Sequence, residues 1–159
     1  MKISTILVPL DGSALAEAAL RPAVDLARDY QAKLVLVRAA EAHAFPIVDP
    51  TEAQVDAVRA AEEYLAGARE RVTAAGLADV ETAVWYGPPA EAIGEAARYR
   101  AADLIVMSSH GRSGLGRLVL GSVTETVLRT TYTPIFLVRP GEGLGDAAFL
   151  PAKAELANV

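Results

Sequence analysis

Hydrophobic and polar residues form two kinds of segment along this chain, which are short apolar runs and longer stretches with apolar residues at helical spacing. The short runs are rich in Val, Ile and Leu and carry few charges, which is typical of strands that are buried on both faces of a parallel sheet. They predict five strands, at Thr5–Pro9, Lys33–Ala39, Glu81–Trp85, Asp103–Met107 and Ile135–Val138.

The stretches between these runs carry apolar residues three or four positions apart, so each of them can bury one face of a helix. Pro22 is expected to bend the first helix, because proline removes a backbone hydrogen bond. Pro89 fits the first turn of the third helix, where a missing N–H costs nothing. The pattern predicts four helices, over residues 15–30, 52–75, 89–100 and 123–129.

The second helix has signals at both ends. Thr51 and Gln54 have the spacing of a capping box, in which each side chain bonds the backbone N–H of the other residue. Gly76 follows the last apolar position and is expected to end the helix. The strict alternation of strands and helices predicts an α/β fold, a three-layer sandwich with a parallel sheet and right-handed crossovers.

Composition and charge limit the classes of function. The chain has 159 residues, 52% of them hydrophobic, which suffices for one domain with a real core. A net charge of -5 argues against a nucleic-acid partner. No run reaches the roughly 18 apolar residues of a membrane span, and the N-terminus lacks a signal-peptide pattern. Because the chain also has no cysteine, we expect a cytoplasmic protein with no nucleic-acid and no membrane partner.

The strongest functional signal lies between Asp103 and Ser122, where an apolar strand leads into a loop rich in Ser and Gly and then into a helix. Backbone N–H groups of such loops and helix starts bind phosphates. Residues 108–139 carry four arginines and one glutamate, a charge of +3 that favours a small anionic ligand. The alternative is ordinary turn-and-cap chemistry, because Ser122 and Glu125 also have the spacing of a capping box.

Asp11 is a second candidate, because ligands of an open parallel sheet lie beyond the carboxyl ends of its strands. It follows the first strand in the turn Pro9-Leu10-Asp11-Gly12-Ser13. Its carboxylate can accept a hydrogen bond from a ribose hydroxyl or hold a metal ion that is bound to phosphate. The alternative role is that of a turn or capping residue in front of the first helix.

These segments resemble the universal stress protein A family. Its nucleotide-binding signature is G-x2-G-x9-G-[S/T], whose second glycine falls on Gly111 and whose last pair falls on Gly121 and Ser122. Ser108 stands where the signature has its first glycine.

Two further segments are similar to that family, which are Ile6–Ser13 near the N-terminus and the later strand Thr133–Val138. The resemblance covers residues 1–140, which are expected to form a universal stress protein domain. Residues 141–159 are expected to be a C-terminal tail outside it.

The resemblance implies a Rossmann-like fold of the adenine nucleotide alpha hydrolase type, with a five-stranded parallel sheet of order 3-2-1-4-5. It implies ATP as ligand, with or without Mg²⁺, and places the backbone of Ala39 at the adenine edge. Met107 would line the adenine or ribose side, or else be a core residue. The residues expected at the nucleotide are Pro9, Leu10, Asp11, Ala39, Met107, Ser108, His110, Gly111, Arg112, Gly121, Ser122 and Val123, with Asp11 as the metal ligand.

Ser108 is the departure from the signature. If its position needs a positive φ or the absence of a β-carbon, serine would hinder binding. If the position is extended, serine can donate a hydroxyl hydrogen bond to the ligand instead.

The implied function is a stress-response regulator or protectant that binds ATP or a related adenine nucleotide. One alternative is a stress protein that binds no nucleotide and acts through protein partners, and another is a slow ATPase or autophosphorylating protein. The chain has no Walker lysine, and neither His43 nor His110 has metal-ligand spacing with other residues. An efficient enzyme is therefore not expected.

The last predicted strand indicates how copies of the chain assemble. Residues 133–138 carry no charge, and the sheet order 3-2-1-4-5 places this strand at an edge. Proteins cover or pair exposed apolar edges, so the sequence and the resemblance predict a homodimer through this strand. The alternative is a monomer in which residues 147–150 of the tail fold back over the edge.

Overall fold

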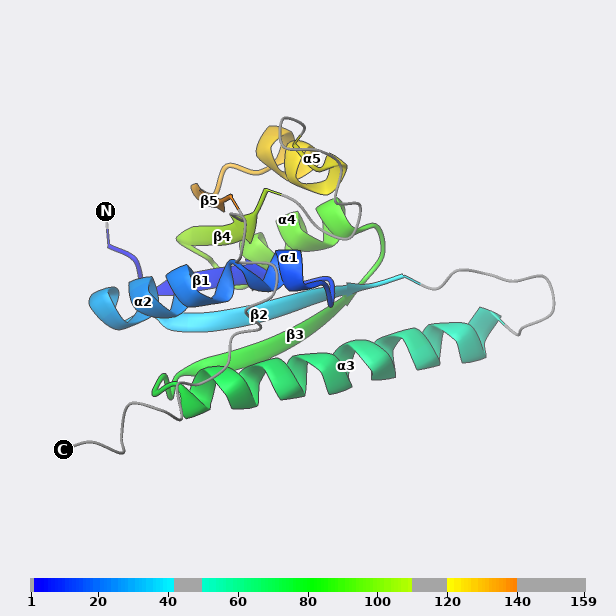
Figure 1. Cartoon of the computed structure of the whole chain (residues 1–159). Helices are drawn as coiled ribbons and strands as arrows, with labels where there is room; N and C mark the ends of the chain where they lie inside the picture. Colours follow the sequence, from blue (N-terminus) through cyan, green and yellow to red (C-terminus); the bar gives the residue numbers. More distant parts are fainter. Residues whose placement is uncertain (1, 42–49, 110–119, 140–159) are drawn as a thin grey trace.

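The computed structural model describes residues 2–41, 50–109 and 120–139. In these residues strands alternate with helices along the chain (Figure 1). The strands are β1 (Thr5–Pro9), β2 (Lys33–Ala40), β3 (Val80–Tyr86), β4 (Leu104–Ser108) and β5 (Ile135–Val138). The helices are α1 (Ala14–Glu17), α2 (Leu20–Tyr30), α3 (Pro50–Ala74), α4 (Pro89–Tyr99) and α5 (Ser122–Thr130).

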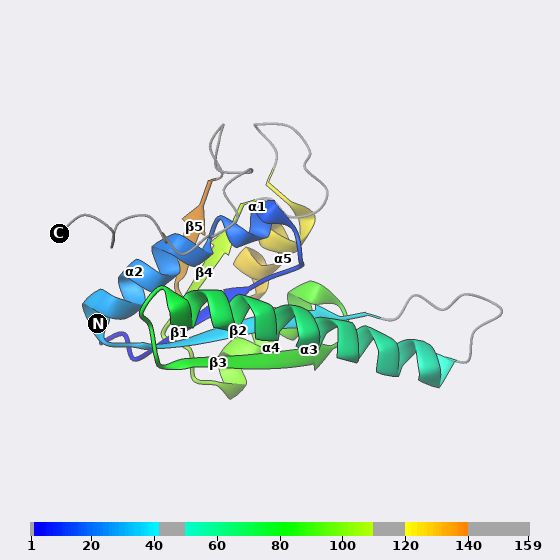
Figure 2. The same ribbon diagram turned by 60° about the horizontal axis from the view of Figure 1, so that its bottom comes forward.

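The strands form one parallel sheet in the order β3-β2-β1-β4-β5, which confirms the predicted topology. Helices α1, α2 and α3 pack on one face of the sheet, and α4 and α5 pack on the other (Figures 1 and 2). The predicted three-layer sandwich is therefore present.

The central strand β1 shows why the sheet forms. Ile6 and Val8 face the layer of α1, α2 and α3, whereas Leu7 faces α4 and α5. All three side chains have no exposed area, because β1 pairs with β2 on one side and β4 on the other. Such a strand must be apolar on both faces, as its sequence is.

Asp103 lies just outside β4, although the sequence predicts the strand to begin with it. Its Oδ2 accepts hydrogen bonds from the backbone N–H groups of Ser4 and Thr5, at 2.8 and 3.0 Å. The carboxylate thus joins the start of β4 to the start of β1. At the other end β4 continues through Ser108, one residue beyond the predicted end.

The first predicted helix is two helices, α1 and α2, and Pro22 explains the break. A helical residue at position 22 would donate its N–H to the carbonyl of Ala18, and proline has no N–H to give. The chain turns more tightly here, and the N–H of Ala19 bonds the carbonyl of Ala16 at 3.1 Å. The predicted bend is therefore a full interruption four residues before the proline.

The capping box predicted at Thr51 and Gln54 is wrong, because α3 already begins at Pro50 and Thr51 lies in its first turn. The predicted end is confirmed. Gly76 has φ +92°, and the N–H of Leu77 bonds the carbonyl of Val72 at 3.4 Å. This is the arrangement of a Schellman motif, in which glycine takes the left-handed conformation.

Helix α3 runs beside β3 and is longer than this strand. Its N-terminal half therefore extends beyond the end of β3 (Figure 2). Its 25 residues span about 37 Å. Ala61, Leu65, Ala68 and Val72 form the buried stripe on the sheet. Val55, in the extending half, is 50% exposed. No helix among the described residues is long and apolar enough to cross a membrane.

The two halves of α3 should respond differently to truncation. Leu65→Ala should lower the free energy of unfolding by about 2–5 kcal/mol, because it leaves a cavity in a site with no exposed area. Val55→Ala should change it by less than about 0.5 kcal/mol. Urea titrations of both variants and the wild type measure this difference, and equal losses would contradict the described packing of α3.

Candidate functional site

A cavity of about 480 Å³ lies at the carboxyl ends of β1, β2 and β4. It sits where the sheet order reverses, because the chain leaves β1 toward β2 on one side and later returns to β4 on the other. Loops on the two sides of such a point diverge and leave a crevice between them. The sequence places its candidate residues at these same loops.

Every predicted site residue that the structure describes lines this cavity. They are Pro9, Leu10, Asp11, Ala39, Met107, Ser108, Gly121, Ser122 and Val123. The remaining predicted residues, His110, Gly111 and Arg112, lie outside the described part of the chain.

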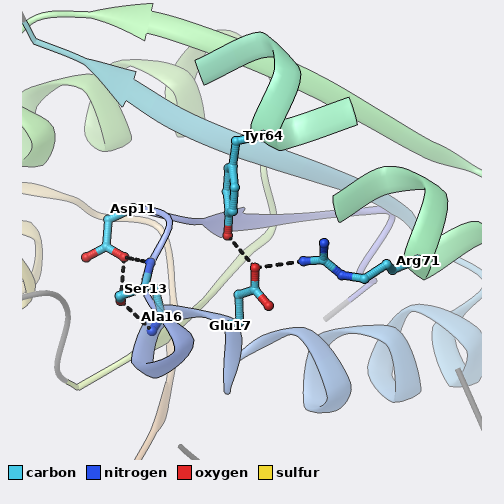
Figure 3. Close-up of polar contacts among 6 residues, drawn as sticks. All are labelled: Asp11, Ser13, Ala16, Glu17, Tyr64 and Arg71. Atoms are coloured by element: carbon cyan, nitrogen blue, oxygen red, sulfur yellow. Dashed lines mark hydrogen bonds and ion pairs between the residues drawn. The ribbon is translucent and has the colours of Figure 1, made fainter. Parts of the chain in front are cut away.

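The turn after β1 is held by Asp11 (Figure 3). Its Oδ1 accepts hydrogen bonds from the N–H and the hydroxyl of Ser13, at 2.8 and 2.6 Å. The Ser13 hydroxyl oxygen in turn accepts the N–H of Ala16 at 3.1 Å and caps α1. Gly12 has φ +85°, which favours glycine. Asp11 therefore has the turn role that the sequence left open, and it lines the cavity as well.

Metal binding at Asp11 stays a prediction. Within residues 2–41, 50–109 and 120–139, no group of three or more His, Cys, Asp or Glu side chains is placed to hold a metal ion. The predicted role of Asp11 is to hold a metal ion that is bound to phosphate.

The wall formed by β2 and α3 contains residues that the sequence analysis missed. Arg38 and Glu41 lie at the end of β2, and Ala57 and Ala60 come from α3. Arg38 had a signal in the sequence, because it is the one charge in the apolar run from Leu34 to Ala40. The alanines had none, because the packing of α3 beside the end of β2 is a tertiary feature.

Arg38 stacks on an aromatic ring that is itself fixed by hydrogen bonds. Its guanidinium carbon lies 4.7 Å from the ring centroid of Tyr64. The Tyr64 hydroxyl donates to Glu17 Oε1 at 2.7 Å, and Arg71 donates to the same oxygen at 2.7 Å (Figure 3). Burial, and then the hydrogen bond to Glu17, raises the pKa of Tyr64, so the hydroxyl stays protonated as a donor.

The start of α5 forms the opposite wall. The capping box predicted at Ser122 and Glu125 is wrong, because Gly121 is the N-cap and Ser122 is the first helical residue. Glycine has no side chain that could cap the helix, and Glu125 pairs instead with Arg129 at 2.8 Å. The Ser122–Glu125 capping box therefore does not account for this helix start. Gly121 has φ -61° and ψ 143°, an extended conformation open to any residue.

Hydrogen bonds hold α5 against the end of β4. The buried Thr124 hydroxyl donates to the carbonyl of Ser108 at 3.1 Å. The N–H of Gly121 bonds the carbonyl of Ser109 at 3.0 Å. The N–H of Ser109 bonds the carbonyl of Val138 at 2.8 Å, which joins the same turn to β5.

Met107 and Ser108 have buried positions in this wall. Met107 is 4% exposed, so it is both a core residue and part of the cavity lining. Ser108 is the last residue of β4, and the only described non-glycine residues with positive φ are Gln31 and Ala101. The serine thus has an ordinary backbone conformation, and glycine is not required here for a positive φ.

Residues 2–139 match the sequence model of the universal stress protein family. A protein of Staphylococcus aureus (strain USA300) that is named as a universal stress protein is 34% identical over 140 residues, which cover 86% of this chain and 84% of the relative.

Solved structures show the same fold. Universal stress protein UspA from Lactobacillus plantarum superposes with a TM-score of 0.76 at 25% identity, over 87% of this chain and 99% of that one. A universal stress protein in complex with cAMP superposes with a TM-score of 0.69 at 28% identity, over 87% of this chain and 98% of that one.

The bond between α5 and β4 can be tested by stability. Thr124→Val should lower the free energy of unfolding by about 1–2 kcal/mol, because the buried carbonyl of Ser108 loses its donor. The exposed Thr126 donates to the carbonyl of Ser122 within α5, so Thr126→Val should cost less than about 0.5 kcal/mol. Urea denaturation of the pair measures both, and a larger loss at position 126 would refute this account.

Proposed function

Because the chain belongs to the universal stress protein family, we propose that it binds ATP or a related adenine nucleotide in the cavity and acts as a stress-response regulator or protectant. The observation that carries the proposal is the cavity itself, which gathers the described candidate residues from three separate loops. The cAMP complex of a 28% identical relative supports an adenine nucleotide as the class of ligand. The absence of cysteine is consistent with a location of this protein in the cytoplasm, which we include in the proposal.

The backbone of β2 supports a place for the adenine base. The ladder between β1 and β2 ends at Pro9 and Val37, with one further bond from the N–H of Leu10 to the carbonyl of Val37. Groups two residues apart in a strand point to the same side, so Ala39 directs its N–H and C=O to where β1 has ended. Ala39 would offer them to the edge of the base.

The phosphates would lie at the other wall. The uncapped start of α5 carries Ser122 and Val123, whose backbone N–H groups and helix dipole favour an anion. Gly121 adds no side chain in front of them. Asp11, between the two walls, would bind the ribose hydroxyls or a Mg²⁺ ion on the phosphates. We assign no catalytic residue, so hydrolysis of ATP would be slow at most.

The proposed phosphate site predicts that a side chain at position 121 prevents nucleotide binding, whereas one at a distant glycine does not. Gly121→Val should abolish binding of Mg-ATP, because a branched side chain would stand at the mouth of the phosphate site while the extended backbone accepts it. Gly94→Val is a matched control, since a β-carbon at Gly94 would meet nothing within 4 Å and Gly94 is not part of the cavity wall.

Isothermal titration calorimetry measures the affinity of both variants, and circular dichroism checks their fold. A folded Gly121→Val protein with unchanged affinity would rule out nucleotide binding at this loop.

We further propose a homodimer through β5. This strand is at the edge of the sheet, and Phe136 and Leu137 are 45% and 40% exposed. Ile135 packs toward α4 and α5 and Val138 packs toward the other layer, so β5 is fixed on both faces while Phe136 and Leu137 stay accessible. Pairing two copies across a two-fold axis would cover these side chains and the open strand edge.

The proposed dimer predicts that a charged side chain on β5 prevents the association of two copies. Phe136→Asp should give a monomer, because pairing would bury two carboxylates close to the axis. Tyr132→Asp is the control, since Tyr132 is fully exposed in the segment before β5. Light scattering after size exclusion measures the mass of each. A wild-type monomer at micromolar concentration would rule out the dimer.

A further inference from the structure

Arg38 has a particular place in the charge balance of the cavity. Among the lining residues that the structure describes, Asp11 and Glu41 are acidic and Arg38 is the one cation. Two carboxylates without this arginine would give the described wall a potential that repels phosphate. Among the described lining residues, Arg38 therefore supplies the positive charge that opposes this repulsion.

The side chain of Arg38 reaches across the sheet edge toward β1. A β-carbon added at Gly12 would lie 3.4 Å from both terminal nitrogens of Arg38. The guanidinium group of this β2 residue thus lies over the turn that follows β1. The positive charge consequently lies beside the turn that carries Asp11, at the carboxyl end of β1.

Three residues that are not part of the cavity wall fix this position. Tyr64 presents its ring to the guanidinium, and Glu17 accepts the Tyr64 hydroxyl while pairing with Arg71. Glu17 belongs to α1, whereas Tyr64 and Arg71 lie about two turns apart on the same face of α3. The ring therefore cannot turn away without breaking the contact between these two helices.

We propose that Arg38 is a ligand-binding residue that selects for the anionic sugar-phosphate part of the ligand, and that Tyr64 is its positioning residue. The inference rests on the proposed nucleotide binding and extends it to selectivity. Arg38 would give the site a preference for nucleotides over nucleosides. Tyr64 acts only through Arg38, because it does not line the cavity.

The experiment compares the affinities for ATP and for adenosine. The ratio of the two affinities measures how strongly the site prefers the ligand that carries phosphates. Calorimetry on the full chain should show that Arg38→Gln weakens ATP binding about tenfold and adenosine binding less than about twofold, since a hydrogen bond to a charged group is lost. Tyr64→Leu should lower the same ratio, whereas Tyr64→Phe, which keeps the ring, should retain it. The double variant Arg38→Gln/Tyr64→Leu should lose no more than Arg38→Gln alone.

Arg100→Gln is the matched control. Arg100 also stacks on a tyrosine, at 5.9 Å from the ring of Tyr99, and does not line the cavity. Its loss should leave the ratio of ATP to adenosine affinity unchanged. Circular dichroism of each variant separates loss of fold from loss of binding.

The possible outcomes distinguish a failure of the proposed nucleotide binding from a failure of the roles of Arg38 and Tyr64. If the wild type binds neither ligand, the proposed nucleotide binding fails, and the role of Arg38 fails with it. If the wild type binds ATP and Arg38→Gln keeps the affinity ratio, only the role of Arg38 is overturned. If Tyr64→Leu keeps the ratio while Arg38→Gln lowers it, the positioning role of Tyr64 is overturned.

Discussion

The structure depends on the central position of β1, which is paired on both sides and buried on both faces. Because β1 lies between β2 and β4, the chain crosses from β1 to β2 on one side of it and later reaches β4 on the other. The crevice at the carboxyl end of β1 follows from this crossing. The turn after β1 and the walls from β2 and α5 are arranged around that single strand end.

Polar contacts convert this crevice into a site of fixed shape. The Asp11–Ser13 turn and the bond from Thr124 to the Ser108 carbonyl hold the loops from within. The contacts of Tyr64 with Glu17 and Arg38 hold the β2 wall from behind. Buried or half-buried polar groups need partners, and here the partners come from different elements. Satisfying these groups therefore also positions the cavity lining.

Sequence predicts the fold well because strands that are buried on both faces leave unbroken apolar runs, and all five were found. It predicts the start of α4 at Pro89 correctly, whereas the capping-box patterns misplace the starts of α3 and α5. Thr51 and Ser122 both begin capping-box patterns, yet α3 starts one residue earlier and Gly121 caps α5. A four-residue pattern does not determine which residue is the N-cap and which is the first residue of the helix. Arg38, Ala57 and Ala60 were missed as lining because their proximity arises only from packing.

Strand β2 continues to Ala40, whereas its pairing with β1 ends at Val37. A base that binds the backbone of Ala39 would take the place of a missing strand partner. Recognition of this kind uses atoms that every amino acid except proline provides in full. Such a contact depends on the path of the β2 backbone and not on the chemistry of the side chain at position 39. The cavity that Ala39 lines would limit only the size of that side chain.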